Sequence, residues 1–458
     1  MRLKGTRPQT TEQLELPWEV RGEAPEPPRR EEVPMAARAT EGSGRDDLME
    51  RVVSRPNLKA ALQRVRSNKG SPGIDGMTVE ELSAHLQQHW GEIREQLLAG
   101  TYRPQPVKRQ LIPKSGGGER ELGIPTVLDR FIQQALLQVL QSDWDGSFSE
   151  HSYGFRPGRS AHDAIYAAQR YIQEGRLWVV DLDLEKFFDR VNHDVLMARL
   201  AKRTSDRRVL KIIRRYLEAG IMAYGGVVIE RYEGTPQGGP LSPLLANVLL
   251  DEVDKELEKR GHCFVRYADD CNVYVHSRRA GERVMGHLRK LYAKLRLRVN
   301  ESKSAVDLAS NRKILGYSFF GTSGGMVKRR VSKKALTTMK DRVRSITKRT
   351  RGESIPRVIT ELRTYLTGWK AYYRLADTPG TFSELDGWIR RRLRALHLHH
   401  WKRGPTIYRA LRALGVSDRL ATHVAAGGTR RWHNANHDIN IALPIKYFDA
   451  LRLPRLAS

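Results

Sequence analysis

The spacing of apolar residues along the chain changes between a helical period and a strand period. Within 129–141, for example, Ile132, Leu136, Val139 and Leu140 recur at helical spacing. The same criterion predicts further helices at 46–66, from 78, from 193, at 241–260 and at 280–298. Strands are predicted at 107–113, 177–184, 263–267, 272–276 and 313–320. Beyond residue 330 the pattern is helical, so the sequence predicts a mixed α+β region followed by a helical one.

Carboxylates lie at the ends of two predicted strand elements. A mostly apolar run, typical of a buried strand, ends at Asp183. Residues 263–267 and 272–276 predict a hairpin with Asp269 and Asp270 at its turn. Adjacent carboxylates repel each other, and Asn-Gly or Asp-Gly would make a turn at lower cost. If the strands lie side by side, the three carboxylates converge on a site of the kind that Mg²⁺ prefers.

The distribution of charge separates the same two regions. The 458 residues include 80 Lys and Arg against 52 Asp and Glu, a formal net charge of +28. Residues 323–458 hold 29 basic and nine acidic side chains, whereas residues 1–45 hold eight of each. This excess, interleaved with Trp and Tyr, favours a nucleic-acid partner over a generally basic surface or an anionic membrane. Some of these aromatic residues have helical spacing and are also candidates for the core.

Composition argues against several classes of protein. Two cysteines are too few for a disulfide framework or a cysteine-rich zinc site. No stretch approaches the ~20 consecutive apolar residues of a membrane span. No apolar run follows the first charged residues, so we expect no secretory signal and a cytoplasmic location.

Several motifs resemble those of the group II intron-encoded reverse transcriptase/maturase family. The hairpin turn Tyr-Ala-Asp-Asp resembles the Tyr-X-Asp-Asp motif of reverse transcriptases, and Gly-Thr-Pro-Gln-Gly-Gly-Pro at 234–240 resembles a second palm motif. The others, in chain order, are at 122–126, 153–160, 183–189 and 315–317. The resemblance covers about residues 46–425.

The resemblance implies a two-metal polymerase site. Asp183, Asp269 and Asp270, with the backbone carbonyl of Leu184, would hold two Mg²⁺ ions, for which Mn²⁺ can substitute. The metals would activate a primer 3′-OH for attack on the α-phosphate of a dNTP. Asp181, two residues before Asp183 on the same strand face, is the rival ligand, although the family motif favours Asp183.

The resemblance also implies nucleotide-binding residues. Phe188 matches an aromatic gate that excludes a ribose 2′-OH; the alternative is a core phenylalanine. Gln237 matches a residue that lines the incoming nucleotide. Lys114 and Arg120 flank a glycine-rich turn and resemble cations that grip the triphosphate. Lys303 matches a lysine sometimes assigned as the acid for pyrophosphate, or is a solvated lysine at a helix end.

The implied architecture is a right-hand polymerase followed by a helical domain. We expect a disordered extension at 1–45, fingers and palm with an antiparallel sheet at 46–322, and an α-helical thumb/maturase domain at 323–425. The remainder, 426–458, would be a short basic tail, a possible remnant of a DNA-binding region. The predicted RNA contacts lie on one helix, at Arg390, Arg391, Arg392 and Arg394.

The expected function is RNA-directed DNA polymerase activity together with maturase activity. Partners would be the group II intron RNA, an RNA template with a DNA primer, dNTPs and target DNA, the last at the nucleoid. No cysteine follows Cys271, so we expect none of the C-terminal nuclease that many relatives carry, and priming by another route. Alternatives are a maturase that no longer polymerises and a reverse transcriptase with a host role such as defence. An RNA polymerase is the weakest rival.

Overall fold

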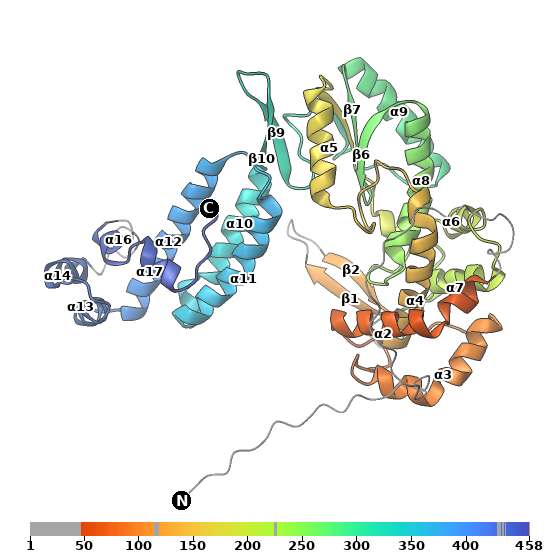
Figure 1. Ribbon diagram of the computed structural model, residues 1–458, viewed down its shortest axis with the longest axis horizontal. Helices are drawn as coiled ribbons and strands as arrows, with labels where there is room; N and C mark the ends of the chain where they lie inside the picture. The colour runs from red at the N-terminus through yellow and green to blue at the C-terminus, as the bar shows by residue number, and fades with distance from the viewer. Residues whose placement is uncertain are drawn as a thin grey trace, which may run out of the picture. The chain divides into compact units, whose positions relative to one another are not determined.

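The computed structural model describes residues 47–113, 119–223, 227–427, 432, 435 and 437–457 (Figure 1). The extension predicted at 1–45 lies outside these residues. The chain divides into two compact units. The first comprises the described residues of 1–164, 180–273 and 279–306, and the second those of 165–179, 274–278 and 307–458.

The first unit begins with helices that pack on one another through apolar faces. They are α1 (Leu48–Val52), α2 (Arg55–Asn68), α3 (Leu82–Leu98) and α4 (Val127–Trp144). The single helix predicted at 46–66 is in fact two, because Ser54 is extended and Pro56 stands at the start of α2. Proline is favoured in a first helical turn, where its missing N–H is not needed.

Two four-stranded sheets follow, with strands drawn from residues 107 to 308. One has the order β2-β1-β4-β5, formed by β1 (Val107–Pro113), β2 (Glu119–Ile124), β4 (Ile221–Met222) and β5 (Val228–Ile229). The β1–β2 and β4–β5 pairs are antiparallel, but β1 and β4 are parallel. This sheet is therefore mixed and not purely antiparallel as predicted.

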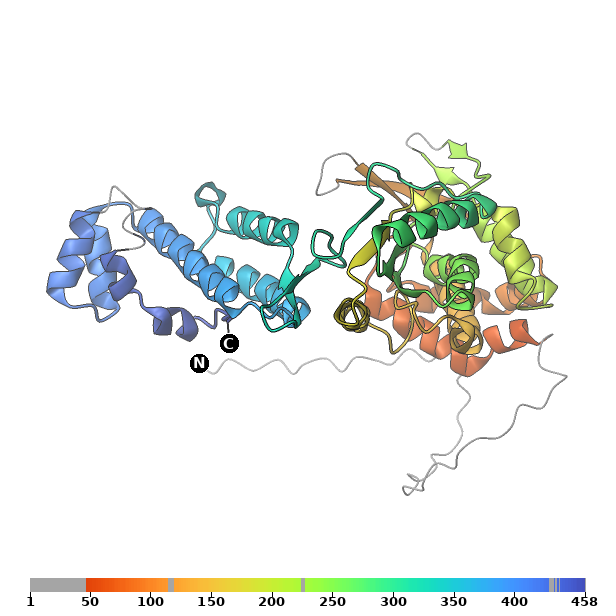
Figure 2. The same cartoon turned by 90° about the horizontal axis from the view of Figure 1, so that it is seen from above.

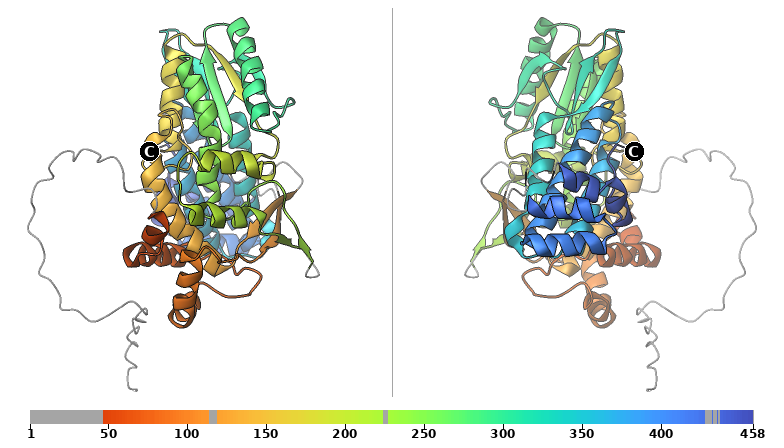
Figure 3. Two further views of the ribbon diagram at one scale, coloured as in Figure 1. Left: turned by 90° about the vertical axis from the view of Figure 1, so that its right-hand side faces the viewer. Right: turned by 90° about the vertical axis from the view of Figure 1, so that its left-hand side faces the viewer.

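The other sheet carries the predicted carboxylates. Its order is β6-β7-β3-β8, formed by β6 (Cys263–Tyr267), β7 (Asp270–Val275), β3 (Trp178–Leu182) and β8 (Ala305–Leu308). The hairpin predicted around Asp269 is confirmed as β6–β7. Figure 3 shows the strands with neighbouring helices α8 (Ser242–Lys259) and α9 (Arg278–Lys294). The other helices that precede β8 in the chain are α5 (Ala161–Gln173), α6 (His193–Leu200) and α7 (Arg207–Glu218).

The second unit is mostly helical, as the sequence predicts. A hairpin of β9 (Tyr317–Gly321) and β10 (Val327–Val331) precedes the helices. These are α10 (Lys333–Ile346), α11 (Ile355–Tyr373), α12 (Pro379–Trp401), α13 (Gly404–Ala413), α14 (Asp418–Ala426), α16 (Asp438–Ala442) and α17 (Ile445–Ala450) (Figure 2). None of the helices in the described part of the chain is both long and apolar enough to cross a membrane.

The described part of 426–458 differs from the predicted tail. Leu443, Phe448 and Leu456 belong to the same buried core as α11 and α12. The buried carboxylate of Asp386 on α12 accepts the backbone N–H of Leu456 at 3.0 Å. The prediction of a tail rested on the net charge of the segment and not on its apolar residues, which make this packing possible.

Candidate active site

The turn between β6 and β7 presents two adjacent carboxylates. Asp269 is half-buried and Asp270 is exposed. Ala268, which precedes them, has a φ of +57°. That left-handed conformation costs an L-residue roughly 1–2 kcal/mol, so surrounding contacts must hold it in place.

A fully buried arginine supplies those contacts. The Nη1 of Arg266 donates to the carbonyl of Ala268 at 2.9 Å and to the Oδ1 of Asn247 at 2.9 Å. Its Nε lies 2.8 Å and its Nη2 2.6 Å from carboxylate oxygens of Asp254, and Nη2 also donates to the Oγ of Ser152 at 2.7 Å. Neither side chain of the Arg266–Asp254 pair is exposed to solvent. The turn is thus tied to α8 and to the segment around Ser152.

Asp183 directly follows the end of β3 and is fixed through its backbone. Its N–H donates to the Oγ of Ser304 at 3.0 Å, and its carbonyl accepts the N–H of Asn300 at 2.8 Å. The Nζ of Lys303 lies 3.3 Å from the Oδ2 of Asp183. Leu184, the predicted carbonyl ligand, is buried and forms a bridge to the 299 position.

The donor set fits a hard divalent cation. β7 and β3 are hydrogen-bonded neighbours, so Asp270 and Asp183 come from adjacent strands. The ammonium of Lys303 already places a cation against Asp183, and carboxylate oxygens are the ligands that Mg²⁺ prefers. Among the described residues, however, no three His, Cys, Asp or Glu side chains are already spaced as a metal site. A metal ion bound here would therefore need further oxygen ligands, such as those of a substrate phosphate.

A cavity of about 530 Å³ contains two of the predicted nucleotide-binding residues. Phe188 and Gln237 both line it, and Phe187 is buried in the core. The Nε2 of Gln237 donates to the Oδ1 of Asp189 at 3.0 Å. The cavity is formed by segments far apart in the chain: Asn68, Leu122, Arg130, Gln134, Leu137, Phe155, Gly238, Gly239, Pro240, Ser242 and Pro243.

The two cations predicted to bind the triphosphate are Lys114 and Arg120. Lys114 lies outside the described residues, and Arg120 is described only as part of β2. Glu121, the residue after Arg120, lies 3.0 Å from the Nη2 of Arg109. This ion pair fixes Glu121 within the β1–β2 sheet.

The predicted RNA-binding arginines of α12 differ in their surroundings. Arg390, Arg391 and Arg392 are half-buried. Arg394 is a correction to the prediction: it is 3% exposed, and its Nε donates to the carbonyl of Leu443 at 3.0 Å. Burial lowers the pKa of Arg394 to about 10. Arg394 therefore holds the segment around residue 443 instead of facing a ligand in solvent.

Further arginines surround Trp388 on α12. The guanidinium carbons of Arg344 and Arg392 lie 5.7 and 5.5 Å from the centre of its ring. Burial, with the positive charges of Arg344 and Arg349, lowers the pKa of Arg392. Like charges held together in this way favour an anion, and sequence reasoning missed Arg344 and Arg349 because they lie on or just after a different helix, α10.

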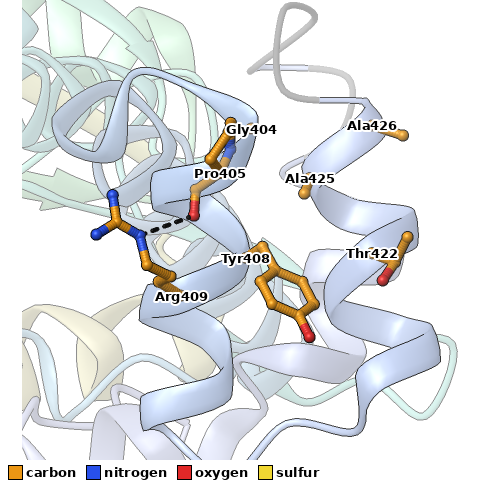
Figure 4. A pocket seen from close by; sticks show the side chains of 7 residues that line it. All are labelled: Gly404, Pro405, Tyr408, Arg409, Thr422, Ala425 and Ala426. Carbon is orange, nitrogen blue, oxygen red and sulfur yellow. Dashed lines mark hydrogen bonds between the residues drawn. The ribbon is translucent and has the colours of Figure 1, made fainter.

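The second unit has an open apolar hollow of about 460 Å³. Figure 4 shows Tyr408 on α13 pointing towards α14, opposite Thr422 and Ala425. Arg409 at its edge donates to the carbonyl of Pro405 at 3.4 Å. Nothing in the structure indicates an occupant.

Sequence reasoning also missed the residues that hold the Asp269–Asp270 turn, namely Ser152, Asn247, Asp254 and Arg266. The available signal was the charge of Arg266 within an otherwise apolar strand, because a charge at such a position requires a buried partner.

Two family models match the chain. Residues 112–319 match the reverse transcriptase (RNA-dependent DNA polymerase) family, and residues 336–415 match the group II intron maturase-specific domain. Together the matched segments account for well over half of the chain. The two matched segments are thus similar to those of group II intron-encoded reverse transcriptases and maturases.

Individual relatives cover smaller parts of the chain. Protein YkfC of Escherichia coli K12 is 39% identical over 230 residues, 48% of this chain and 60% of that protein. The group II intron-encoded protein LtrA of Lactococcus lactis is 37% identical over 207 residues, 45% of this chain and 34% of that protein. The chain thus matches less than two thirds of the length of either relative. A chain of a Cas6-RT-Cas1–Cas2 complex is 27% identical, covering 56% of this chain and 43% of that one, with a TM-score of 0.35.

Proposed function

We propose that this protein is an RNA-directed DNA polymerase that copies intron RNA into cDNA and binds the same RNA to assist splicing and mobility. The observation that carries the proposal is the Asp269–Asp270 turn, held by a fully buried arginine, next in the sheet to the strand that ends at Asp183. The matches to reverse transcriptase and maturase-specific models support the two activities.

The proposed metal ligands are Asp183, Asp269, Asp270 and the carbonyl of Leu184. Two Mg²⁺ ions, or Mn²⁺ in their place, would lower the pKa of the primer 3′-OH and neutralise charge on the leaving pyrophosphate. The protein's own part is to keep these oxygens in fixed positions on adjacent strands. Lys303 stays beside Asp183 and is available to interact with the phosphates.

The cavity beside Phe188 and Gln237 is the proposed nucleotide pocket. Phe188 would exclude a ribose 2′-OH, while Asp189 holds the amide of Gln237 in one orientation. Lys114 and Arg120 remain the proposed contacts of the triphosphate. Replacing Phe188 by Val should raise rNTP incorporation relative to dNTP by about 10–200-fold, since one clash is removed. Equal discrimination by wild type and F188V would exclude Phe188 as the gate.

Residues 323–425, which lie within the second unit, are the proposed thumb and maturase region, and residues 46–322 are the proposed fingers and palm. Arg390, Arg391 and Arg392 remain proposed RNA contacts, and the segment 426–458 a proposed contact of target DNA. We further propose a cytoplasmic location with association to the nucleoid. The thumb/maturase and RNA-contact assignments are supported by the cationic side chains around Trp388 and by the maturase-specific match.

Primer extension on poly(rA)/oligo(dT) with dTTP and Mg²⁺ tests the polymerase directly. The expected result is extension by the full chain that disappears without a divalent metal. A well-folded protein that binds intron RNA and promotes its splicing, but does not extend the primer, would instead establish the maturase-only alternative. Extension without any effect on splicing would favour a reverse transcriptase with a host role.

A further inference from the structure

We propose that Arg266, through its buried pair with Asp254 and its bond to Asn247, is a positioning residue that sets where the Asp269 and Asp270 carboxylates meet the metal. The proposal rests on the proposed polymerase function and extends it to residues that do not touch substrate. Both members of the pair are in the first unit, as are the carboxylates they position.

Every donor of the Arg266 guanidinium has an acceptor. A guanidinium has five N–H donors. The Nε is bound by Asp254, Nη1 by Asn247 and the carbonyl of Ala268, and Nη2 by Asp254 and Ser152. A side chain with every donor engaged has one possible orientation, so its bond to the Ala268 carbonyl fixes that peptide in space.

Stability alone does not account for this arrangement. Removing two charges from water carries a large desolvation penalty, and apolar residues of similar volume are often as stable as a buried ion pair. The preceding residues of β6, Phe264 and Val265, are fully buried, so this strand accommodates apolar side chains in the core. What an apolar residue cannot do is bind the carbonyl of a left-handed Ala268.

Close backbone packing at Gly154 also holds the turn. A Cβ added at Gly154 would lie 2.3 Å from the backbone nitrogen of Ala268, which is far inside any normal contact. The carbonyl of Gly154 in turn accepts the Nδ2 of Asn247 at 3.0 Å. Asn247 is therefore hydrogen-bonded both to Arg266 and to Gly154, two residues that contact Ala268.

The catalytic consequence follows from the short distance along the chain. Asp269 is the residue after Ala268, so a shift of the Ala268 peptide moves its carboxylate directly. A displacement of about 1 Å at a reacting centre can reduce the rate about 10²-fold. Metal binding should be weakened as well, since Mg²⁺ tolerates little departure from octahedral geometry.

Substitutions in β6 and α8 separate positioning from stability. The test variants are R266K on β6 and N247A on α8. The control is D251N, which breaks the Arg203–Asp251 pair one turn after Asn247 on α8, with side chains only 18% and 10% exposed and an N–O distance of 2.7 Å. For each full-length protein we would measure thermal unfolding, Mn²⁺ affinity by electron paramagnetic resonance, and extension as a function of Mg²⁺.

The expected result is a split between test and control variants. R266K and N247A should weaken Mn²⁺ binding by about tenfold and lower kcat by up to about 10²-fold, with little change in KM for dTTP. D251N should lose comparable thermal stability yet keep wild-type Mn²⁺ affinity. Unchanged Mn²⁺ affinity in N247A, or an equal loss in D251N, would overturn the positioning role.

Further variants and the metal-binding measurement distinguish the possible outcomes. If R266K does not fold, N247A and G154A carry the comparison, because each disturbs the turn without leaving a buried charge unpaired. Since Mn²⁺ binding is read without turnover, a wild type that binds Mn²⁺ but never extends a primer would refute the polymerase proposal alone. Loss of Mn²⁺ affinity in the variants would then still support positioning.

Discussion

Arginines in the two units are used in opposite ways. In the first unit, Arg266 is wholly buried and every donor has a defined acceptor. In the second, Arg344 and Arg392 lie over Trp388 at the protein surface, and their charges repel each other. The first arrangement fixes the position of one peptide, whereas the second concentrates charge on a surface.

This difference predicts different responses to salt and to substitution. A buried, fully hydrogen-bonded pair is screened little by dissolved ions, so its effect is geometric. Charges near the surface act collectively on a polyanion, and their contribution falls steeply with ionic strength. Polymerase activity should therefore be lost through single residues, and RNA affinity through the sum of many.

The largest effect should come from removing the carboxylate charges of the proposed metal ligands. The double variant D269N/D270N should lose primer extension by at least about 10³-fold, because the metals would lose carboxylate charge at the reacting centre. Binding of intron RNA, measured by filter retention, should stay within about twofold of wild type. A parallel loss of RNA binding would contradict the assignment of polymerase activity and RNA binding to different units.

A buried histidine in the second unit gives a pH-dependent test of its core. Burial lowers the pKa of His397 to about 4, against 6.5 for an exposed histidine, and the Oη of Tyr447 lies 3.2 Å from its Nε2. Between about pH 4 and pH 6.5, His397 is therefore protonated in the unfolded chain but neutral in the folded chain. The stabilising effect of keeping His397 neutral is therefore complete above about pH 6.5 and is lost progressively as the pH falls towards 4.

The loss should approach an order of 3 kcal/mol at the acid end. Urea unfolding followed by fluorescence at pH 4.5, 5.5 and 7 would measure this loss in the free energy of unfolding, in wild type and in H397F. The variant should show a flatter dependence, because it has no proton to take up at this position. An identical slope in both proteins would show that His397 does not control the acid response.

The surface cations should have a smaller, additive effect. R344Q/R349Q should lower RNA affinity by about tenfold at physiological salt and reduce the slope of log K against log salt by about 1–2, since two phosphate contacts are removed. The control is R342Q/R357Q, which removes two cations that are paired with Glu361 and Glu353. Arg344 is also paired, with Asp341 at 2.6 Å, so the contact of Arg344 with Trp388 is what distinguishes the test variant. An equal change in both double variants would mean that total charge matters and the cluster at Trp388 does not.

The smallest effect should be local to the C-terminal segment. D386A leaves the backbone N–H groups of Leu456 and Ala457 without their acceptor. We expect a loss of about 1–3 kcal/mol, detected as faster hydrogen exchange at 456–457. Primer extension should not change. Unaltered exchange at these amides would show that the carboxylate does not hold the segment.

Some of the structure was readable from local pattern. The strand predicted at 107–113 has those bounds as β1, and the hairpin that carries Asp269 is β6–β7. Strand alternation and a turn are properties of neighbouring residues, so a single sequence reveals them. Phe188 could be named a candidate gate because it matches a position in the motif that the family resemblance supplies. The structure places Phe187 in the core and Phe188 at the cavity wall.

The sequence alone also determined the chemistry available, namely which carboxylates, cations and aromatic residues the chain possesses and where charge accumulates. Only the tertiary structure decided which of them meet. Arg266 bonds to Ser152, 114 residues away, and Arg394 is buried against Leu443, 49 residues away. A charged side chain looks the same in the sequence whether it faces solvent or a buried acceptor. Its role depends on long-range packing, which decides whether the cost of desolvation is offset by a partner.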